Sequence, residues 1–178
     1  MSKKSYYSEF HYSDPPHELV EGQVSNAREA IGNVTISFAD LEDQLSSSIS
    51  FLLKGGDEVG RIVTAEMSFK NKINLLGSLF KETAAGSDRL DHLDELLGLC
   101  CGAELLRNQV VHSSWSTGLI GEPAVRRKFT AKRRHGLKKQ EEELTPGQIH
   151  EIALHCDYLI FCLDELMYEA FGSEYGEP

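Results

Sequence analysis

The sequence has no C-x-x-C pair, although it contains four cysteines. Without a C-x-x-C pair, the spacing of the four cysteines fits neither a disulfide framework nor a zinc ribbon. All four fall within apolar stretches of helical periodicity, so we expect reduced thiols that pack in a core: Cys100, Cys101, Cys156 and Cys162. The sequence therefore predicts no metal site, and nothing in it indicates a cofactor.

Long apolar runs are also missing. The longest uncharged apolar stretch is far shorter than the roughly 18 residues of a membrane span. The first residues, MSKKSYYSE, lack the apolar centre of a signal peptide. These absences predict a cytoplasmic protein that does not contact a membrane.

Positive charge is scarce over the chain as a whole. Among 178 residues, 28 are acidic and 18 are Lys or Arg, which gives a formal net charge of -10. Such a surface repels polyanions, so a nucleic acid would have to bind at a local cluster of positive charge. The length and the 40% hydrophobic content suit a single domain with one core.

Helical periodicity begins after residues 1–16, which lack it and predict an extended or disordered arm. Apolar steps of three and four then continue to Leu52. They predict one helix, or two collinear helices with a kink or break at Gly32 and Asn33, before a stop at Gly55 and Gly56. A second helix is expected over about 58–82, and its predicted inward residues are Ile62, Val63, Phe69, Ile73, Leu76 and Phe80.

Two further helices are expected, one from Ser87 or Asp88 to about Ser113 and one from Thr145 and Pro146 onward. The sequence thus predicts an all-α protein, a four- to five-helix up-and-down bundle in one domain over 17–172. Residues 173–178 form a tail. A basic insertion precedes the last helix.

This insertion, residues 116–144, has no helical periodicity, and the alternation over 125–132 suits an extended hairpin or an ordered loop. Residues 126–139 include eight Lys or Arg and no acid, a formal +8, whereas the rest of the chain carries -18. Positive charge is therefore concentrated in one short segment.

The end of the third predicted helix combines several polar residues. On a regular helix one row of residues faces the core: Leu96, Leu99, Ala103, Leu106 and Val110. Glu104, Asn108 and His112 form a second row, and Arg107 lies between the two rows. Arg107 and His112 are about 140° apart on a regular helix, so a shared site needs a distorted last turn or a second copy of the helix.

The pattern Arg107-Asn108-x-x-x-His112, at the end of the third long helix, resembles the signature of the HEPN superfamily. The resemblance extends loosely over residues 36–171, and its specific part is this motif. It implies a helical bundle that forms a two-fold dimer, with the Arg and His of both copies in one cleft. It also implies a metal-independent endoribonuclease of a prokaryotic toxin–antitoxin or defence system, with an antitoxin or another regulatory protein as partner.

RNA carries its own nucleophile, the 2′-hydroxyl, so cleavage needs a base, a proton for the leaving oxygen and positive charge near the phosphate. The resemblance assigns proton transfer to His112 and phosphate binding to Arg107, with Asn108 orienting either one. Glu104 is positioned to pair with Arg107 or to tune the imidazole. Ser114 occupies the place of a tyrosine that accepts adenylyl groups in one branch of the family, so we do not expect that form of silencing.

The basic segment supplies candidate residues for RNA, and no DNA is expected: Arg126, Arg127, Lys128, Lys132, Arg133 and Arg134. The alternative is a solvated loop that folds back on Glu141–Glu143 and the acidic body. For Arg107 and His112 the alternative is a surface ion-pair partner and a histidine that satisfies the last carbonyls of the helix. Two functions follow, a dimeric endoribonuclease or a non-catalytic module that binds RNA, a nucleotide or a protein through the same cleft.

Overall fold

A computed structural model describes residues 21–84, 87–117, 123–132 and 136–175. The remaining residues, which include the predicted arm at 1–16 and the last three residues of the predicted tail, lie outside the described parts of the chain. Five helices and three strands form the described fold: α1 (Glu21–Leu53), α2 (Asp57–Thr64), α3 (Phe69–Thr83), α4 (Ser87–Val111), β1 (Ser114–Thr117), β2 (Ala124–Lys132), β3 (Gly136–Leu144) and α5 (Pro146–Phe171). A 3-10 turn, η3 (Gly172–Tyr175), follows α5.

The prediction of a mainly helical protein with a hairpin before its last helix is confirmed. The all-α class is too narrow, because β1, β2 and β3 form an antiparallel sheet. None of the helices in the described ranges has both the length and the apolar content needed to cross a membrane.

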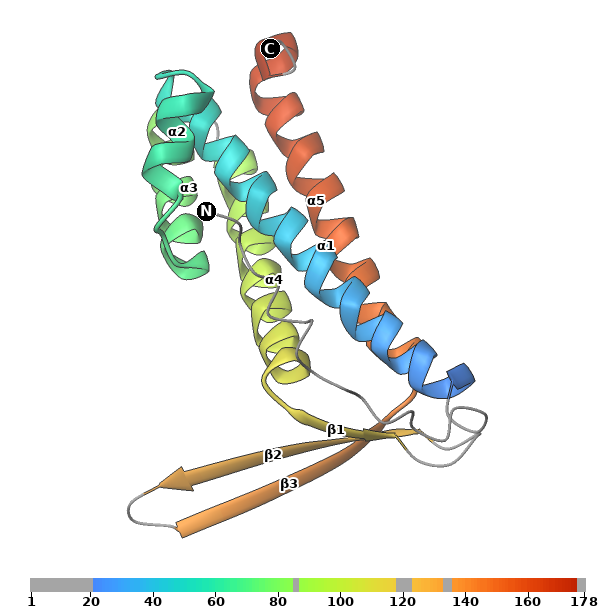
Figure 1. The fold of residues 1–178 in the computed structure, drawn as a ribbon. Coiled ribbons are helices and arrows are strands. Elements are labelled where there is room, and N and C mark those ends of the chain that lie inside the picture. The colour runs from blue at the N-terminus through green and yellow to red at the C-terminus, as the bar shows by residue number, and fades with distance from the viewer. Residues whose placement is uncertain (1–20, 85–86, 118–122, 133–135, 176–178) are drawn as a thin grey trace, which may run out of the picture.

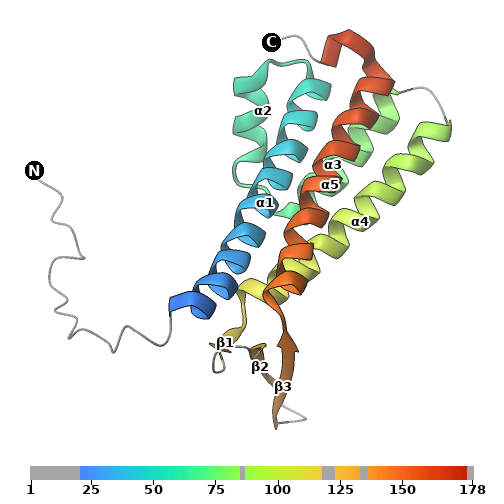
Figure 2. The same ribbon diagram turned by 90° about the vertical axis from the view of Figure 1, so that its right-hand side faces the viewer.

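The helices and the sheet meet at one end of the molecule (Figures 1 and 2). The helices α1 and α5 pack side by side and run in the same direction, and both begin at the sheet end. Helix α4 packs against both and runs the opposite way, so that its C-terminal end also lies at the sheet. Helices α2 and α3 pack against α1 in the part of the bundle away from the sheet.

The core consists of two clusters. The larger cluster joins all the long helices and includes fully buried side chains from each: Leu41, Leu45, Ile49, Leu76, Phe80, Leu93, Leu159, Leu163 and Leu166. The smaller cluster lies where the sheet meets the bundle: Ala30, Val34, Val110, Ile149 and Ala153, with Trp115 and Leu144 packed against them. The indole N–H of Trp115 also donates to the Val110 carbonyl at 2.8 Å. This smaller cluster therefore fixes the sheet to the end of α4.

The predicted second helix over 58–82 is divided in the structure into α2 and α3. Ser68 starts α3 as its N-cap, because its hydroxyl accepts a hydrogen bond from the Asn71 backbone N–H at 3.3 Å. The prediction that Ile62 and Val63 face inward is wrong, since Ile62 is 71% exposed and Val63 is also exposed. The inward residues that were predicted within α3 are buried, as expected.

The end of α1 and the start of α5 agree with the boundaries predicted from the sequence. Helix α1 continues without a break through Gly32 and Asn33 to Leu53. Helix α5 begins at Pro146 after a capping box, in which Thr145 and Gln148 each accept a hydrogen bond from the backbone N–H of the other. The start of α5, and hence the end of β3, is therefore determined by local residues.

The sheet has the order β1-β2-β3, and both strand pairs are antiparallel. The pairing of β2 with β3 runs from Ala124 opposite Leu144 at the base to Lys132 opposite Gly136 at the tip. Strand β1 pairs only with the first four residues of β2. The outer half of the β2–β3 hairpin therefore projects beyond the helices (Figure 1).

Candidate functional site

The buried face of α4 differs from the predicted core row. Leu99 and Leu106 were expected in the core but are 41% and 39% exposed, whereas Leu93, Leu97 and Cys100 are buried. At 100° per residue, the centre of the observed buried face lies about 60° around α4 from the centre of the predicted core row. The new centre coincides with Arg107. The arginine of the motif therefore faces the other helices and does not lie on a flank.

Contacts from two helices hold the Arg107 guanidinium. Its central carbon lies 4.1 Å from the centre of the Phe38 ring on α1, a cation–π contact. Its Nη1 donates to the side-chain oxygen of Asn108 at 2.9 Å. Its Nε is buried and has no hydrogen-bond partner in the described structure. Arg107 is thus held in one orientation, and it still has an unused donor.

Arg107 also acts on α5. Burial, followed by the charge of Asp157, raises the pKa of the Cys156 thiol to about 11, and the positive charge of Arg107 opposes this rise. Arg107 thus contacts Phe38 on α1 and Asn108 on its own helix, and its charge also acts on a thiol of α5.

His112 lies one residue beyond the end of α4, where its backbone N–H donates to the Asn108 carbonyl at 3.1 Å. Its side chain is exposed, as expected for a residue off the core row. In the described structure, no hydrogen bond or ion pair joins the imidazole to Arg107, Asn108 or Glu104. One copy of the chain therefore does not assemble Arg107 and His112 into one site.

Glu104, the candidate tuning residue, is half-buried. The expected pairing with Arg107 does not form, since the side-chain hydrogen bond of Arg107 goes to Asn108. Among the described residues, no three His, Cys, Asp or Glu side chains gather as a metal site. The chemistry available at the end of α4 is therefore that of a guanidinium, an amide and a free imidazole.

Two arginines of the basic segment, Arg126 and Arg127, form ion pairs across the hairpin. Arg126 pairs with Glu142 and donates to the Gln109 side-chain oxygen on α4 at 3.1 Å. Arg127 pairs with Glu141 at 2.8 Å. These pairs match the alternative in which the segment folds back on Glu141–Glu143. Their direct cause is the register, which places Arg126 opposite Glu142 and Arg127 opposite Glu141.

Glu141 receives a second cation from its own strand, because the Lys139 ammonium lies 2.6 Å from its carboxylate. Hydrogen bonds from Lys139 and then Arg127 lower the pKa of Glu141 below its ordinary value of 4.5. Lys128 and Lys138 form no ion pair with any residue in the described ranges. Much of the positive charge near the base of the hairpin is thus neutralised locally.

The remaining candidate RNA-binding residues lie near the tip of the hairpin. The backbone of Lys132 pairs with Gly136, but its side chain is not among the described parts. Arg133 and Arg134 lie outside the described residues. Lys128 is therefore the candidate whose unpaired charge can be located in the structure.

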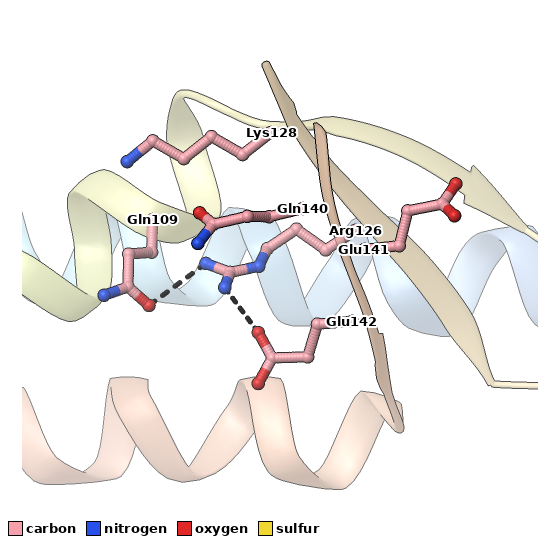
Figure 3. A pocket seen from close by; sticks show the side chains of 6 residues that line it. All are labelled: Gln109, Arg126, Lys128, Gln140, Glu141 and Glu142. Atoms are coloured by element: carbon pink, nitrogen blue, oxygen red, sulfur yellow. Dashed lines mark hydrogen bonds and ion pairs between the residues drawn. The ribbon is translucent and has the colours of Figure 1, made fainter. Parts of the chain in front are cut away.

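A cleft of about 510 Å³ separates the end of α4 from the hairpin (Figure 3), and its lining residues are Gln109, Arg126, Lys128, Gln140, Glu141 and Glu142. The Arg126 guanidinium lies between Gln109 and Glu142. Because Arg126 neutralises Glu142, the Lys128 ammonium and the amides of Gln109 and Gln140 remain as groups that can bind an anionic oxygen. The cleft thus has the chemistry of a single phosphate-contact site.

The cleft and Arg107 lie on different sides of α4. A regular helix separates Gln109 from Arg107 by about 160°. The same geometry separates the positions of Gln109 and His112 by about 60°. His112 therefore lies closer around the helix to the cleft than Arg107 does.

Sequence reasoning did not identify Gln109 or Phe38 as part of this region. Gln109 is one residue after the motif, and nothing in its spacing indicates that it accepts from Arg126. Phe38 belongs to the predicted apolar row of the first helix, but its contact with Arg107 depends on how α1 packs against α4. A signal for these ion pairs was present in the sequence. Arg126 and Arg127 precede the turn by the same numbers of residues by which Glu142 and Glu141 follow it, so a hairpin pairs them.

Comparison of the chain with protein-family models, with curated proteins and with solved structures finds no match. The resemblance to the HEPN superfamily therefore depends on the Arg107-Asn108-x-x-x-His112 motif and on the order of the helices.

Proposed function

We propose that this protein is a metal-independent endoribonuclease of the HEPN type, which acts as a dimer in a prokaryotic toxin–antitoxin or defence system. The observation that carries the proposal is the held guanidinium of Arg107, with an exposed and unengaged His112 just beyond the end of the same helix. A fixed cation and a free imidazole are the two groups that metal-independent RNA cleavage requires.

In the proposed reaction the imidazole of His112 accepts the proton of the RNA 2′-hydroxyl. The 2′-oxygen forms a bond to phosphorus, the bond from phosphorus to the 5′-oxygen breaks, and water supplies the proton for that leaving oxygen. Arg107 stabilises the added negative charge on the phosphate, and Asn108 holds the guanidinium through Nη1. Because one copy does not join Arg107 to His112, the proposal requires the second copy of α4.

Loss of the His112 side chain is the direct test of cleavage. We expect H112A to lose cleavage of single-stranded RNA while its helical circular dichroism stays unchanged, because the side chain is exposed. H92A is a matched control, since His92 is also exposed on α4 and lies far from the motif. Wild-type cleavage should persist in EDTA. Cleavage by H112A, or loss of wild-type cleavage in EDTA, would exclude this mechanism.

The role of Arg107 can be separated from its packing. We expect R107K to keep the positive charge but to lose the planar fork that binds two phosphate oxygens, so that cleavage falls while RNA binding persists. The melting temperature of R107K must be measured as well, because Arg107 also packs on Phe38. An active R107K of normal stability would show that the guanidinium is not needed for the reaction.

RNA binding is proposed to use the cleft beside α4, where Lys128 carries an unpaired charge. The rest of the chain is acidic, so we expect K128E to weaken RNA binding and to reduce its salt dependence, because a phosphate contact releases counterions. K70E is the control, since Lys70 is exposed on α3 away from the sheet. Equal affinity and salt slope for K128E and K70E would place the RNA elsewhere.

The second candidate function is a non-catalytic module that binds RNA, a nucleotide or a partner protein through the same region. It is favoured by the separation of Arg107 and His112 in one copy and by the contacts that already engage the guanidinium. A pure wild-type protein that binds RNA without cleaving it, in the presence and absence of divalent ions, would favour this candidate.

A further inference from the structure

The strand β3 is an exposed edge of the sheet. It is the outer strand in the order β1-β2-β3, and all of its residues except Leu144 are exposed. Figure 1 shows it on the side of the hairpin away from the helices. Proteins usually protect such an edge with charged side chains, with proline or with a β-bulge. β3 contains no proline, and its pairing with β2 is one-to-one over the whole strand.

The charges along β3 complement each other when the strand is reversed. Its centre has the sequence Lys138-Lys139-Gln140-Glu141-Glu142. If a second β3 lies antiparallel with the two Gln140 residues opposite each other, Lys138 faces Glu142 of the second copy, and Lys139 faces Glu141. By symmetry each contact occurs twice. Opposite charges at directly facing positions stabilise an antiparallel pair.

We propose that β3 pairs with β3 of a second copy of this chain, antiparallel and about a two-fold axis at Gln140. The two-fold axis is perpendicular to the sheet. In every possible register, therefore, one residue lies at the axis and faces the same residue of the second copy. Shifting the centre to position 139 places two lysines together, and shifting it to 141 places two glutamates together. The charge pattern therefore selects the register centred on Gln140.

The pairing also gives partners to charges that lack them in one copy. Lys138 has no ion pair in the described structure, whereas in the dimer it faces Glu142 of the second copy. Each carboxylate of the pair then lies between an arginine on β2 and a lysine of the second copy, since Glu142 already pairs with Arg126 and Glu141 with Arg127. The dimer thus forms alternating rows of positive and negative charge across the joined sheet.

The result is a six-stranded sheet with both helical bundles on the same face. A two-fold axis perpendicular to the sheet leaves the same face of both copies on the same side of the joined sheet. Gln140 lies on the face that contributes to the α4 cleft, so this is the face that carries both bundles. In the joined sheet β1, which follows α4, lies at each outer edge, so the pairing does not bring the two α4 ends together. The inference therefore goes beyond the proposed function and names a second contact surface between copies. Its test measures assembly alone, so it can fail while RNA cleavage remains correct.

Charge reversal on β3 tests the pairing. We expect sedimentation equilibrium to give a dimer for the wild type at micromolar concentration, and K138E/K139E to raise its Kd by at least about tenfold, because four attractive contacts become repulsive. K70E/K81E reverses two exposed lysines on α3 and should leave the Kd unchanged. A monomeric wild type, or an equal Kd for both double variants, would overturn the proposal.

Mixing complementary variants gives a sharper result. E141K/E142K should also be monomeric, because lysines then face lysines. Mixed with K138E/K139E, it should form a heterodimer, since each facing position again holds opposite charges. Failure of the two folded variants to associate would contradict the register.

A cross-link at the axis avoids dependence on the folding of the charge variants. In a C101S/C162S background, Q140C should form a disulfide-linked dimer under mild oxidation, because facing residues of an antiparallel pair have Cβ atoms about 4.5–5.5 Å apart, close to disulfide geometry. T130C is the matched control on β2, one strand away from the edge. Equal cross-linking of Q140C and T130C, or none of Q140C, would overturn the two-fold axis at this residue.

Discussion

The helical bundle and the β2–β3 hairpin are stabilised in different ways. The bundle buries rows of apolar side chains from every long helix, and its largest residues are fully buried. Among the described side chains of the β2–β3 hairpin only Ala124 is buried, and cross-strand backbone bonds and ion pairs near its base hold the hairpin together. Exposed ion pairs contribute little, and a two-stranded hairpin is marginally stable by itself in water.

This difference indicates a division of roles. The bundle fixes the end of α4, including Arg107, through packing against Phe38 and the small cluster around Trp115. The hairpin carries eight of the 18 Lys and Arg residues of the chain on a segment that contributes little to the core. A protein with an acidic body can thus present a local basic surface without weakening its fold.

A phenylalanine in each region gives the largest expected contrast. Phe80 is 0% exposed in the bundle, and Phe129 is 54% exposed on the hairpin. We expect F80A to lower the free energy of unfolding by about 3–5 kcal/mol, through lost burial and a cavity. F129A should change it by less than about 0.5 kcal/mol. Urea denaturation followed by circular dichroism measures both, and similar losses would show that the hairpin belongs to the cooperative core.

Substitution of one glycine in each region should also affect the stability of that region alone. A Cβ at Gly60 would overlap Ser50 on α1, so G60A should destabilise the bundle by about 1–3 kcal/mol. Gly136 has a φ of 65° and open space around it, so G136A should cost about 1 kcal/mol within the hairpin alone. Global unfolding should detect G60A, and amide exchange of β2 and β3 should detect G136A. A normal G60A protein would contradict the close contact of α2 with α1.

At alkaline pH the bundle should weaken first. Burial raises the pKa of the Cys100 thiol to about 12, from an ordinary value of 9.0. The unfolded chain therefore releases this proton near pH 9, while the folded chain retains it, so stability falls as the pH rises above 9. Under reducing conditions we expect this thiol to contribute a loss of about 1 kcal/mol for the first pH unit above 9.

The thiol can be identified by comparing two neighbouring cysteines. C100A should remove about half of the alkaline slope, because the Cys156 thiol, with its pKa raised to about 11, contributes the other half. C101A, at a half-buried position, should retain the slope. An unchanged slope in C100A would assign the effect to another group.

At acidic pH the hairpin should loosen while the bundle remains folded. The folded pKa of Glu141 lies below 4.5, so its support is present above that pH and is lost as the pH falls through the folded value. We expect a small rise in the amide exchange of β2 and β3 in acid, and the same rise at neutral pH in E141Q. E143Q is the control, because Glu143 forms no ion pair within the described structure. Equal behaviour of the two variants would remove Glu141 from this role.

The sequence predicted the parts of the fold that depend on local patterns. The periodicity of the first and last helices, the Thr145–Pro146 start and the alternation over 125–132 all correspond to observed elements. The break between α2 and α3 was missed because Ser68 caps a helix within a continuous apolar pattern. Capping by one serine does not change that pattern.

The candidate site was predicted less completely, because its geometry depends on packing between helices. The position of His112 at an exposed helix end followed from its place off the core row. The packing of the half-buried Arg107 on Phe38 did not, because α4 is rotated so that Leu99 and Leu106 are partly exposed. A helix with apolar residues on more than one face leaves this rotation open until its neighbours are known.

The central claim is that the end of α4 and the hairpin form one RNA-binding surface. Hydrogen–deuterium exchange of H112A, with and without single-stranded RNA in EDTA, tests it most directly, because this variant should bind without cleaving. We expect RNA to protect residues 104–116 and the amides of β2 and β3, and to leave α2 and α3 unchanged. Protection confined to α2 and α3, or no protection at the end of α4 and in the hairpin, would contradict the claim.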